Sequence, residues 1–541
     1  MSRELYYNGT ILTAVDAFPK AAGILVEDGR ILEVIREFDG EAERLYPDAK
    51  PVDLQGKTLV PGFIDGHSHF LQNILELKQL NAKPAPLGEA NSVEELIKTL
   101  KEQLNDPVYA DQEYLHARGY DEAVYPDHRI PTRFDLDQVT TKPLVLDHAS
   151  GHNSVFNSAA LALANITDDY EPGPDGSVGR FEDGTLTGLF HENARRDVLP
   201  KTKADIWEEF EQGIEQVTLL YSSKGVTTAQ DGATPREWHD YVQRLAEEGK
   251  LKIDLVSYVL GEGTDELITA KEPQNYAYKN HYRVAGKKFF LDGSPQAKTA
   301  WLTKPYHIPP EGRDETYRGY GIYTDEQLLL LFEEAIRNHW QINVHTNGDE
   351  AIEQLIRVYG EALKKTGVTQ DLRPVSIHCQ TVREDQLDRI KELGILVSFF
   401  VDHTYYWGDY HASAVLGEER AVRISPLASA IRRGISFSLH QDTPVTSQNP
   451  LFAIHNAVNR KTRSGRVLGE EYRISAWEAL KAVTIQAAYQ LFEEKEKGSI
   501  EAGKRADFAI LDKNPLTVPA DTIKDIQVVE TIKDGCTIYR K

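Results

Sequence analysis

The sequence predicts an α/β fold: a (β/α)₈ TIM barrel with a small composite β-sandwich from both chain ends and an inserted α+β subdomain. Eight short runs rich in β-branched residues end near polar residues, and most precede an amphipathic helical pattern. This alternation is typical of parallel strands with crossover helices, and eight such units favour closure into a barrel. The two ends of the chain also carry similar strand patterns, which favours a shared sheet outside the barrel.

The barrel strands are expected at the β-branched runs, and the crossover helices at the amphipathic stretches. The strand candidates are residues 57–67, 225–231, 252–260, 287–293, 341–345, 374–378, 394–400 and 434–442. Helical patterns cover residues 92–104, 206–221, 325–339 and 383–394.

The stretch between the first two strand candidates is too long for a structureless loop. It holds strand-like runs of its own at 113–120 and 142–148, so we expect a separate subdomain there. The chain ends each carry two alternating strands around an Asp-Gly pair, Asp28-Gly29 and Asp534-Gly535, which is a hairpin signal. The expected division is a sandwich of 1–58 and 495–541, a barrel of 59–77 and 206–494, and an insertion of 78–205.

Composition excludes several classes of function. The net charge of −23 argues against a nucleic-acid partner, because phosphate binding needs a basic face. No run of about 20 apolar residues is present, and the N-terminus lacks the apolar core of a signal peptide, so we expect no membrane partner and a cytoplasmic location. Two cysteines, Cys379 and Cys536, are too few for a disulfide framework.

A His-x-His pair, His67 and His69, ends the first strand candidate. Alternate residues of a strand point to one side, so the two imidazoles can chelate a borderline metal such as zinc. Alone, such a pair is more often a polar strand end than a metal site.

Three more candidate ligands end other strand candidates, namely His345, His378 and Asp442. A lone buried histidine is usually a hydrogen-bonded core residue. Ends of parallel barrel strands converge on one mouth, however, where catalytic residues collect. Their common placement therefore predicts a metal centre.

Lys288 lies on another strand candidate. An ammonium has no lone pair for a metal. Carboxylation by CO₂ would give a carbamate whose two oxygens can bridge two ions. The alternative is a lysine that extends to solvent, and a shift of one residue would turn Lys287 inward instead.

The chain resembles the amidohydrolase superfamily, specifically its amidohydrolase-3 or YtcJ-like branch, which includes N-substituted formamide deformylases. The likeness covers almost the whole chain. Its motifs include VPGFIDGHSHF (60–70), RGYDEAVYPDHRIPTRFDLD (118–137), SGHNSVFNSAAL (150–161), GKKFFLDGSPQAKTA (286–300), HTNGDEAI (345–352), GISFSLHQDTPV (434–445) and GSIEAGKRADFAILDKNP (498–515).

The resemblance implies Lys288 as the carboxylated lysine, one metal held by His67, His69, Lys288 and Asp442, and a second held by Lys288, His345 and His378. Two departures occur. Ile377 stands where the family often has Glu, and HTNGD replaces HAIGD. Neither departure removes a ligand, but both could alter the hydrogen bonds around the ligands and the fit of a substrate.

The implied reaction is hydrolysis of a non-peptide carbon–nitrogen bond, in an amide, N-formyl or related small-molecule substrate. A metal would activate water to hydroxide, and Asp442 would be general base and then general acid. We expect substrate contacts from His152, His403 and Trp407, with a packed loop or a structural hydrogen bond as the alternatives. His440 shares the strand face of Asp442 and is expected beside the ligands, and Asp292 and Asp349 could orient them.

Two other functions stay open. A barrel of this ancestry could catalyse a metal-dependent isomerisation or decarboxylation, or serve as a non-catalytic scaffold. The scaffold would be expected to lose ligands, and this chain keeps all six. A homodimer is possible.

Overall fold

A computed structural model describes residues 3–151, 153–173, 176–199, 206–269, 277–310 and 312–541. The chain forms two compact units. One contains residues 1–71, 214–444 and 448–541, and the other contains residues 72–213 and 445–447. No helix among the described residues is both long and apolar enough to cross a membrane.

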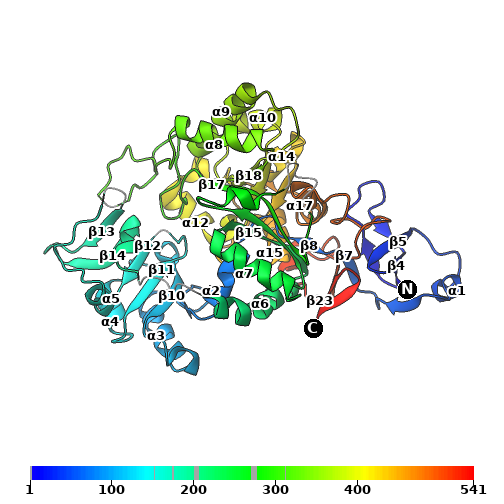
Figure 1. The fold of residues 1–541 in the computed structure, drawn as a ribbon, viewed down its shortest axis with the longest axis horizontal. Coiled ribbons are helices and arrows are strands. Elements are labelled where there is room, and N and C mark those ends of the chain that lie inside the picture. The colour runs from blue at the N-terminus through cyan, green and yellow to red at the C-terminus, as the bar shows by residue number, and fades with distance from the viewer. Residues whose placement is uncertain (1–2, 152, 174–175, 200–205, 270–276, 311) are drawn as a thin grey trace. The chain divides into compact units, whose positions relative to one another are not determined.

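The larger unit is built around an eight-stranded, all-parallel sheet (Figure 1). Neighbouring strands follow chain order, and the sheet curls into a TIM-barrel-like fold. The strands are β8 (Phe63–Ile64), β15 (Val226–Thr234), β16 (Asp254–Val259), β17 (Tyr282–Phe290), β18 (Gln341–Thr346), β19 (Val375–His378), β20 (Leu396–Phe399) and β21 (Phe437–Leu439).

The first and last strands of this sheet approach each other closely. Gly66 follows β8, and a Cβ added there would lie 2.4 Å from Ser438 Oγ on β21. Gln490 connects the same two places, since its Nε2 donates to Gly66 O and its Oε1 accepts from Ser438 Oγ. The absence of a side chain at Gly66 therefore lets the two edges meet.

One strand prediction was wrong. Residues 57–67 are not a single strand but two short ones, β7 (Thr58–Pro61) and β8. They belong to different sheets, since β7 pairs with β2 and β22. The chain changes sheet at Gly62, where an added Cβ would lie 2.4 Å from Thr227 Oγ1. Only β8 belongs to the parallel sheet.

Helices follow most of the parallel strands, and α8, α9 and α10 lie beside β17 and β18 in Figure 1. Their sequences begin and end as helices do; α8 starts with a capping box between Thr324 and Gln327, and α9 ends at left-handed Gly367. The helices of this layer include α6 (Trp207–Ser222), α7 (Arg236–Glu247), α8 (Asp325–Arg337), α9 (Asp349–Thr366), α10 (Glu384–Glu392), α14 (Leu427–Arg432), α15 (Pro450–Asn459), α16 (Ala476–Ala482) and α17 (Ile485–Gln490).

Both chain ends contribute to a six-stranded mixed sheet in the larger unit. Its order is β24 (Cys536–Arg540), β23 (Val528–Lys533), β22 (Phe508–Leu511), β7, β2 (Thr10–Leu12) and β3 (Lys20–Ala21). A four-stranded sheet accompanies it, in the order β5 (Arg30–Ile35), β4 (Gly23–Glu27), β1 (Arg3–Tyr7) and β6 (Lys50–Asp53). One apolar core joins residues from both ends, including Ile24, Leu59, Phe508 and Ile532.

The smaller unit has its own six-stranded mixed sheet and its own apolar core. The sheet order is β13 (Gly176–Arg180), β14 (Leu186–Glu192), β12 (Asn153–Phe156), β11 (Leu144–His148), β10 (Leu115–Tyr120) and β9 (Leu80–Asn81). Its helices are α3 (Val93–Gln103), α4 (Arg133–Asp137) and α5 (Ser158–Leu163).

Candidate metal centre and active site

The six predicted ligands belong to five of the parallel strands or to the residues just after them. His67 and His69 follow β8, Lys288 lies within β17, His345 within β18, His378 ends β19, and Asp442 follows β21. The carboxyl ends of parallel barrel strands open on one face, so these side chains share one mouth.

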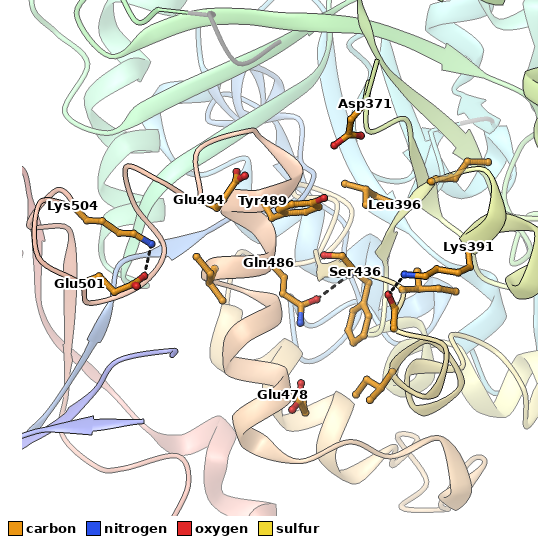
Figure 2. A pocket seen from close by; sticks show the side chains of 17 residues that line it. Asp371, Lys391, Leu396, Ser436, Glu478, Gln486, Tyr489, Glu494, Glu501 and Lys504 are labelled. Carbon is orange, nitrogen blue, oxygen red and sulfur yellow. Dashed lines mark hydrogen bonds and ion pairs between the residues drawn. The ribbon is translucent and has the colours of Figure 1, made fainter. Parts of the chain in front are cut away.

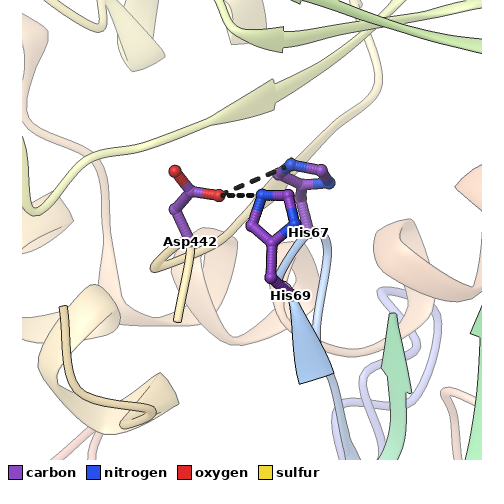
Figure 3. Close-up of side chains that lie close together, drawn as sticks. All are labelled: His67, His69 and Asp442. Atoms are coloured by element: carbon purple, nitrogen blue, oxygen red, sulfur yellow. Dashed lines mark ion pairs between the residues drawn. The ribbon is translucent and has the colours of Figure 1, made fainter. Parts of the chain in front are cut away.

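His67, His69 and Asp442 form the tightest group (Figure 3). Asp442 Oδ1 lies 3.5 Å from His67 Nε2 and 3.4 Å from His69 Nε2. One ligand atom from each of the three side chains lies within 4.8 Å of the others. Burial raises the pKa of Asp442, but His378, His69 and His67 lower that pKa more, and it stays well below the usual value. The carboxylate is therefore ionised and can bind a cation.

His67 directs a lone pair toward this group. Its Nδ1 lies 3.3 Å from Gln230 Oε1, an acceptor, so Nδ1 carries the hydrogen and Nε2 does not. Lys288 Nζ lies 3.1 Å from the same Nε2. Lys288 is only 1% exposed, and its burial lowers its pKa to about 7 against the opposing effects of Asp442 and Asp231.

His345 and His378 form the second pair, with His345 Nδ1 3.1 Å from His378 Nε2. His345 Nε2 lies 3.0 Å from Gly293 O and 3.1 Å from Asn347 Nδ2, so donation to Gly293 is the arrangement that would leave Nδ1 free of hydrogen for a metal. His378 Nδ1 lies 3.0 Å from His440 Nε2, and His440 Nδ1 lies 2.8 Å from Ser398 Oγ. With His378 donating to His440 and His440 donating to Ser398, His378 Nε2 carries a lone pair, as a metal ligand requires.

Imidazole nitrogens and a carboxylate oxygen thus gather in one buried place. His345 Nδ1 and His378 Nε2 lie 3.1 Å apart, close enough to share one hydrogen or, without it, to ligate a cation beside them. Asp442 Oδ1 is buried and makes no hydrogen bond with the described residues. The donor set of imidazoles and a carboxylate is the one that zinc and similar divalent metals prefer, so these residues fit a metal.

Other nearby residues take different roles. Lys287 pairs with Asp265, away from the centre, whereas Lys288 points inward. Asp292 accepts backbone N–H groups of Trp301, Asn347 and Gly348, and its Oδ1 lies 3.6 Å from His345 Nε2.

Two further polar residues lie close to the ligands in the sequence. Asp349 binds Thr303 and Arg383 instead of a ligand. Cys379 is fully buried, and burial raises its pKa to about 12, which makes it a poor nucleophile.

The loop after β20 carries the predicted substrate-contacting aromatics. His403 and Trp407 are 2% and 3% exposed, and their ring centroids lie 4.5 Å apart. His403 begins α11 (His403–Tyr406). His152, predicted as a third substrate contact, lies outside the described residues.

Two polar residues that position the ligands were not identified from the sequence. Gln230, in the middle of β15, binds His67 Nδ1 through Oε1 and Gly66 O through Nε2. Ser398 on β20 binds His440. Both are polar residues near the end of a strand expected from the sequence, 225–231 and 394–400, and that placement was the available signal.

A cavity of about 810 Å³ lies elsewhere in the larger unit (Figure 2). Its lining includes Leu396 and Phe437, the first residues of β20 and β21, so it opens at the amino ends of the strands. That face of such a barrel serves stability and not catalysis. The charged side chains labelled there are mostly paired, as Lys504 is with Glu501.

The smaller unit holds another cluster of possible ligands, Asp121, Glu122 and His148. His148 Nδ1 accepts the backbone N–H of Ser150 at 3.0 Å, so its hydrogen is on Nε2, which faces Glu122 Oε2 at 3.2 Å. A protonated ring nitrogen cannot bind a metal. The cluster is an imidazole–carboxylate pair.

Comparison with known proteins places the chain among amidohydrolases. A family model described as "Amidohydrolase family" matches residues 50–539. The chain is 26% identical to N-substituted formamide deformylase of Arthrobacter pascens, over 100% of this chain and 99% of that protein. It is 25% identical to the putative amidohydrolase YtcJ of Bacillus subtilis, with both chains fully covered.

A solved structure agrees with these relatives. An uncharacterized metal-dependent hydrolase from Pyrococcus horikoshii is 26% identical, with a TM-score of 0.74 over 96% of this chain and 99% of that chain.

Proposed function

Because the chain belongs to the amidohydrolase family, and so is a hydrolase of carbon–nitrogen bonds, we propose that it cleaves an amide or N-formyl bond of a small molecule. The observation that carries this proposal is the group of His67, His69 and Asp442, whose ligand atoms lie within 4.8 Å of one another, with Lys288 beside His67 and the His345–His378 pair next to it. The named relative that acts on N-substituted formamides supports the choice of substrate class.

The centre would hold two divalent ions, and its imidazole and carboxylate donors favour zinc. His67, His69 and Asp442 would bind one, His345 and His378 the other, and Lys288 would bridge them after carboxylation. The support for carboxylation is that burial keeps the pKa of Lys288 at about 7, so its neutral amine can attack CO₂ to form a carbamate and release one proton. When bound, the ions lower the pKa of a water molecule and polarise the substrate carbonyl.

Asp442 is the proposed proton carrier. It accepts the proton from the attacking water as the new C–O bond forms, and it donates that proton to the leaving nitrogen as the C–N bond breaks. Its position beside His67 and His69 places it at the proposed centre, and its low pKa keeps the carboxylate unprotonated before the first step.

The support for substrate contacts is geometric. His403 and Trp407 follow β20 at the same end of the strands as the ligands. The ring of Phe400 packs against both of them and also against the ring of His378, a proposed ligand. A polar imidazole beside an indole gives a substrate both a hydrogen-bond partner and an apolar surface.

A substrate screen with a matched variant tests the proposal. Enzyme loaded with zinc and bicarbonate is incubated with N-formyl, N-acyl and cyclic amides, and released amine and formate or carboxylate are measured. We expect wild type to release equal amounts of both products. Asp442→Asn should retain the fold by circular dichroism and lose at least about 100-fold in rate.

Three results would contradict the proposal. If the Asp442→Asn variant turns over substrate at the wild-type rate, Asp442 is not the proton carrier. Isomerised or decarboxylated products without hydrolysis would favour the alternative reactions. A protein that retains no metal after supplementation would favour a scaffold.

A further inference from the structure

Two buried histidines beyond the proposed ligands form a hydrogen-bonded pair. His403 Nδ1 lies 3.1 Å from His411 Nε2, and the two rings are nearly parallel, with an angle of 7° between their planes. Both side chains are buried. His411 begins a short π-helical turn, His411–Val415, after the loop that carries Trp407.

The pair lies one aromatic ring away from the proposed metal ligands. The ring centroid of Phe400 is 4.6 Å from that of His403 and 6.0 Å from that of His378. It is also 5.2 Å from the ring of His440, which supports His378. Only the ring of Phe400 therefore separates His403 from the proposed ligand His378.

The hydrogen positions of the pair follow from its surroundings. Burial keeps both imidazoles neutral, lowering the pKa of His411 to about 3 and that of His403 well below its usual value. One hydrogen therefore lies between them. His411 Nδ1 is buried and has no hydrogen-bond partner among the described residues.

If His403 donated, the other hydrogen of the pair would be an unpaired N–H at His411 Nδ1. Either arrangement leaves one N–H without a partner among the described residues, at His411 Nδ1 or at His403 Nε2. His411 Nδ1 is a fully buried unpaired atom and His403 Nε2 is not, and a fully buried unpaired N–H is rarer in proteins than an unpaired acceptor. The favoured arrangement is that His411 Nε2 donates to His403 Nδ1. His403 then carries its hydrogen on Nε2, an atom that makes no hydrogen bond with the described residues.

We propose that His411 is a positioning residue that holds His403 in the Nε2–H tautomer, so that His403 donates a hydrogen bond to an oxygen of the substrate beyond the reacting bond. The substrate class narrows accordingly, to amides that carry a further carbonyl, carboxylate or ether oxygen. The inference rests on the proposed function for the identity of the substrate, but the tautomer of His403 can be measured without turnover.

Nuclear magnetic resonance of protein labelled with ¹⁵N-histidine measures that tautomer, with His403→Gln to assign the signals. We expect the wild type to show His403 with a bare Nδ1 and a protonated Nε2. His411→Gln should keep this state, because its amide N–H can donate in place of the ring. His411→Phe, similar in size but without a donor, should give a mixture. Wild type with the hydrogen on Nδ1 would overturn the proposal.

Kinetics with formanilide and 4-formamidobenzoate test the substrate side, since only the second carries an added carboxylate. We expect wild type to prefer 4-formamidobenzoate by about tenfold or more in kcat/KM, the effect of one hydrogen bond to a charged group. His403→Phe and His411→Phe should remove most of this preference at unchanged metal content, whereas His403→Gln and His411→Gln should retain it. A preference that survives His403→Phe contradicts the proposal.

His239→Phe is the matched control. His239 is a buried histidine on α7 whose Nδ1 lies 2.8 Å from Tyr282 Oη, and it should alter neither the tautomer of His403 nor the substrate preference. If neither compound is hydrolysed, the proposed function fails for N-formyl anilines. The resonance measurement still decides whether His411 fixes the tautomer.

Discussion

The proposed ligands His67, His345 and His378 each place one ring nitrogen against a polar neighbour. Gln230 serves His67, Gly293 serves His345, and His440 serves His378. Such partners fix the tautomer and the orientation of a ligand before a metal arrives. Histidine positions in the sequence identify the ligands, but the partners come from strands far along the chain.

At the residue scale, substitution of the adjacent residues Lys287 and Lys288 tests whether Lys288 bridges two metal ions, as proposed. Lys288→Ala is expected to lower activity by about 100-fold and to remove one of two bound metals, because the bridging oxygens are lost. Short carboxylic acids such as acetate should restore part of both. Elemental mass spectrometry measures the number of bound metal ions. Kinetics with added acetate measure the restored activity.

Lys287→Ala is the control, since Lys287 pairs with Asp265 instead of a ligand. It should keep both metals and near wild-type activity. A Lys288→Ala enzyme with two metals would rule out the bridge.

At the scale of elements, residues at strand ends leave the regular strand conformation to aim their side chains. His378 and Asp442 have positive φ values of 72° and 53°. The alternation of a strand predicts which residues share a face, but these left-handed turns lie outside that pattern. A sequence pattern therefore locates the strand end without giving the direction of its last side chain.

Strand packing also explains a glycine in β15. A Cβ at Gly232 would lie 2.1 Å from Cε1 and 2.7 Å from Nδ1 of His67. Gly232→Ala is expected to displace the imidazole, to weaken metal binding by about tenfold or more and to lower activity, while far-ultraviolet circular dichroism stays unchanged. Equilibrium dialysis with zinc measures the binding.

Gly360→Ala serves as the control for this test. Gly360 lies within α9, where an added Cβ meets only ordinary contacts, the nearest at 3.5 Å from Leu393 Cδ2. Alanine there should stabilise the helix by about 0.5–1 kcal/mol and leave metal binding unchanged. Equal zinc affinity in Gly232→Ala and wild type would show that His67 does not bind the metal.

At the scale of the whole molecule, a buried ion cluster joins a barrel strand to the C-terminal segments. Asp254 on β16 pairs with Lys497 and with Lys533 of β23, and Lys533 also pairs with Asp507 at 2.9 Å. Burial raises the pKa of Asp254, but Lys497 and Lys533 lower it further, so the net pKa is well below the usual value.

This cluster predicts acid sensitivity. A carboxylate with a depressed pKa in the folded state contributes stability above its unfolded pKa of about 3.9, and that contribution is lost as pH falls through the folded pKa. Asp254→Asn should therefore lower the free energy of unfolding at pH 7 by about 3–5 kcal/mol, since two buried lysines lose a partner. It should also flatten the fall in stability below about pH 4.

Urea unfolding at several pH values measures both effects, with Asp371→Asn as an exposed control carboxylate. An Asp254→Asn protein as stable as wild type at pH 7 would show that the cluster does not hold these segments together.

The sequence by itself determined the alternation of strands and helices, the hairpins at Asp28-Gly29 and Asp534-Gly535, and the strand-end positions of the ligands, because each is a local pattern. Tertiary structure alone decided that residues 57–67 divide between two sheets, that Lys288 and not Lys287 faces inward, and that His411 pairs with His403. These outcomes depend on contacts between segments distant in the chain, and no local pattern encodes which of those segments will meet.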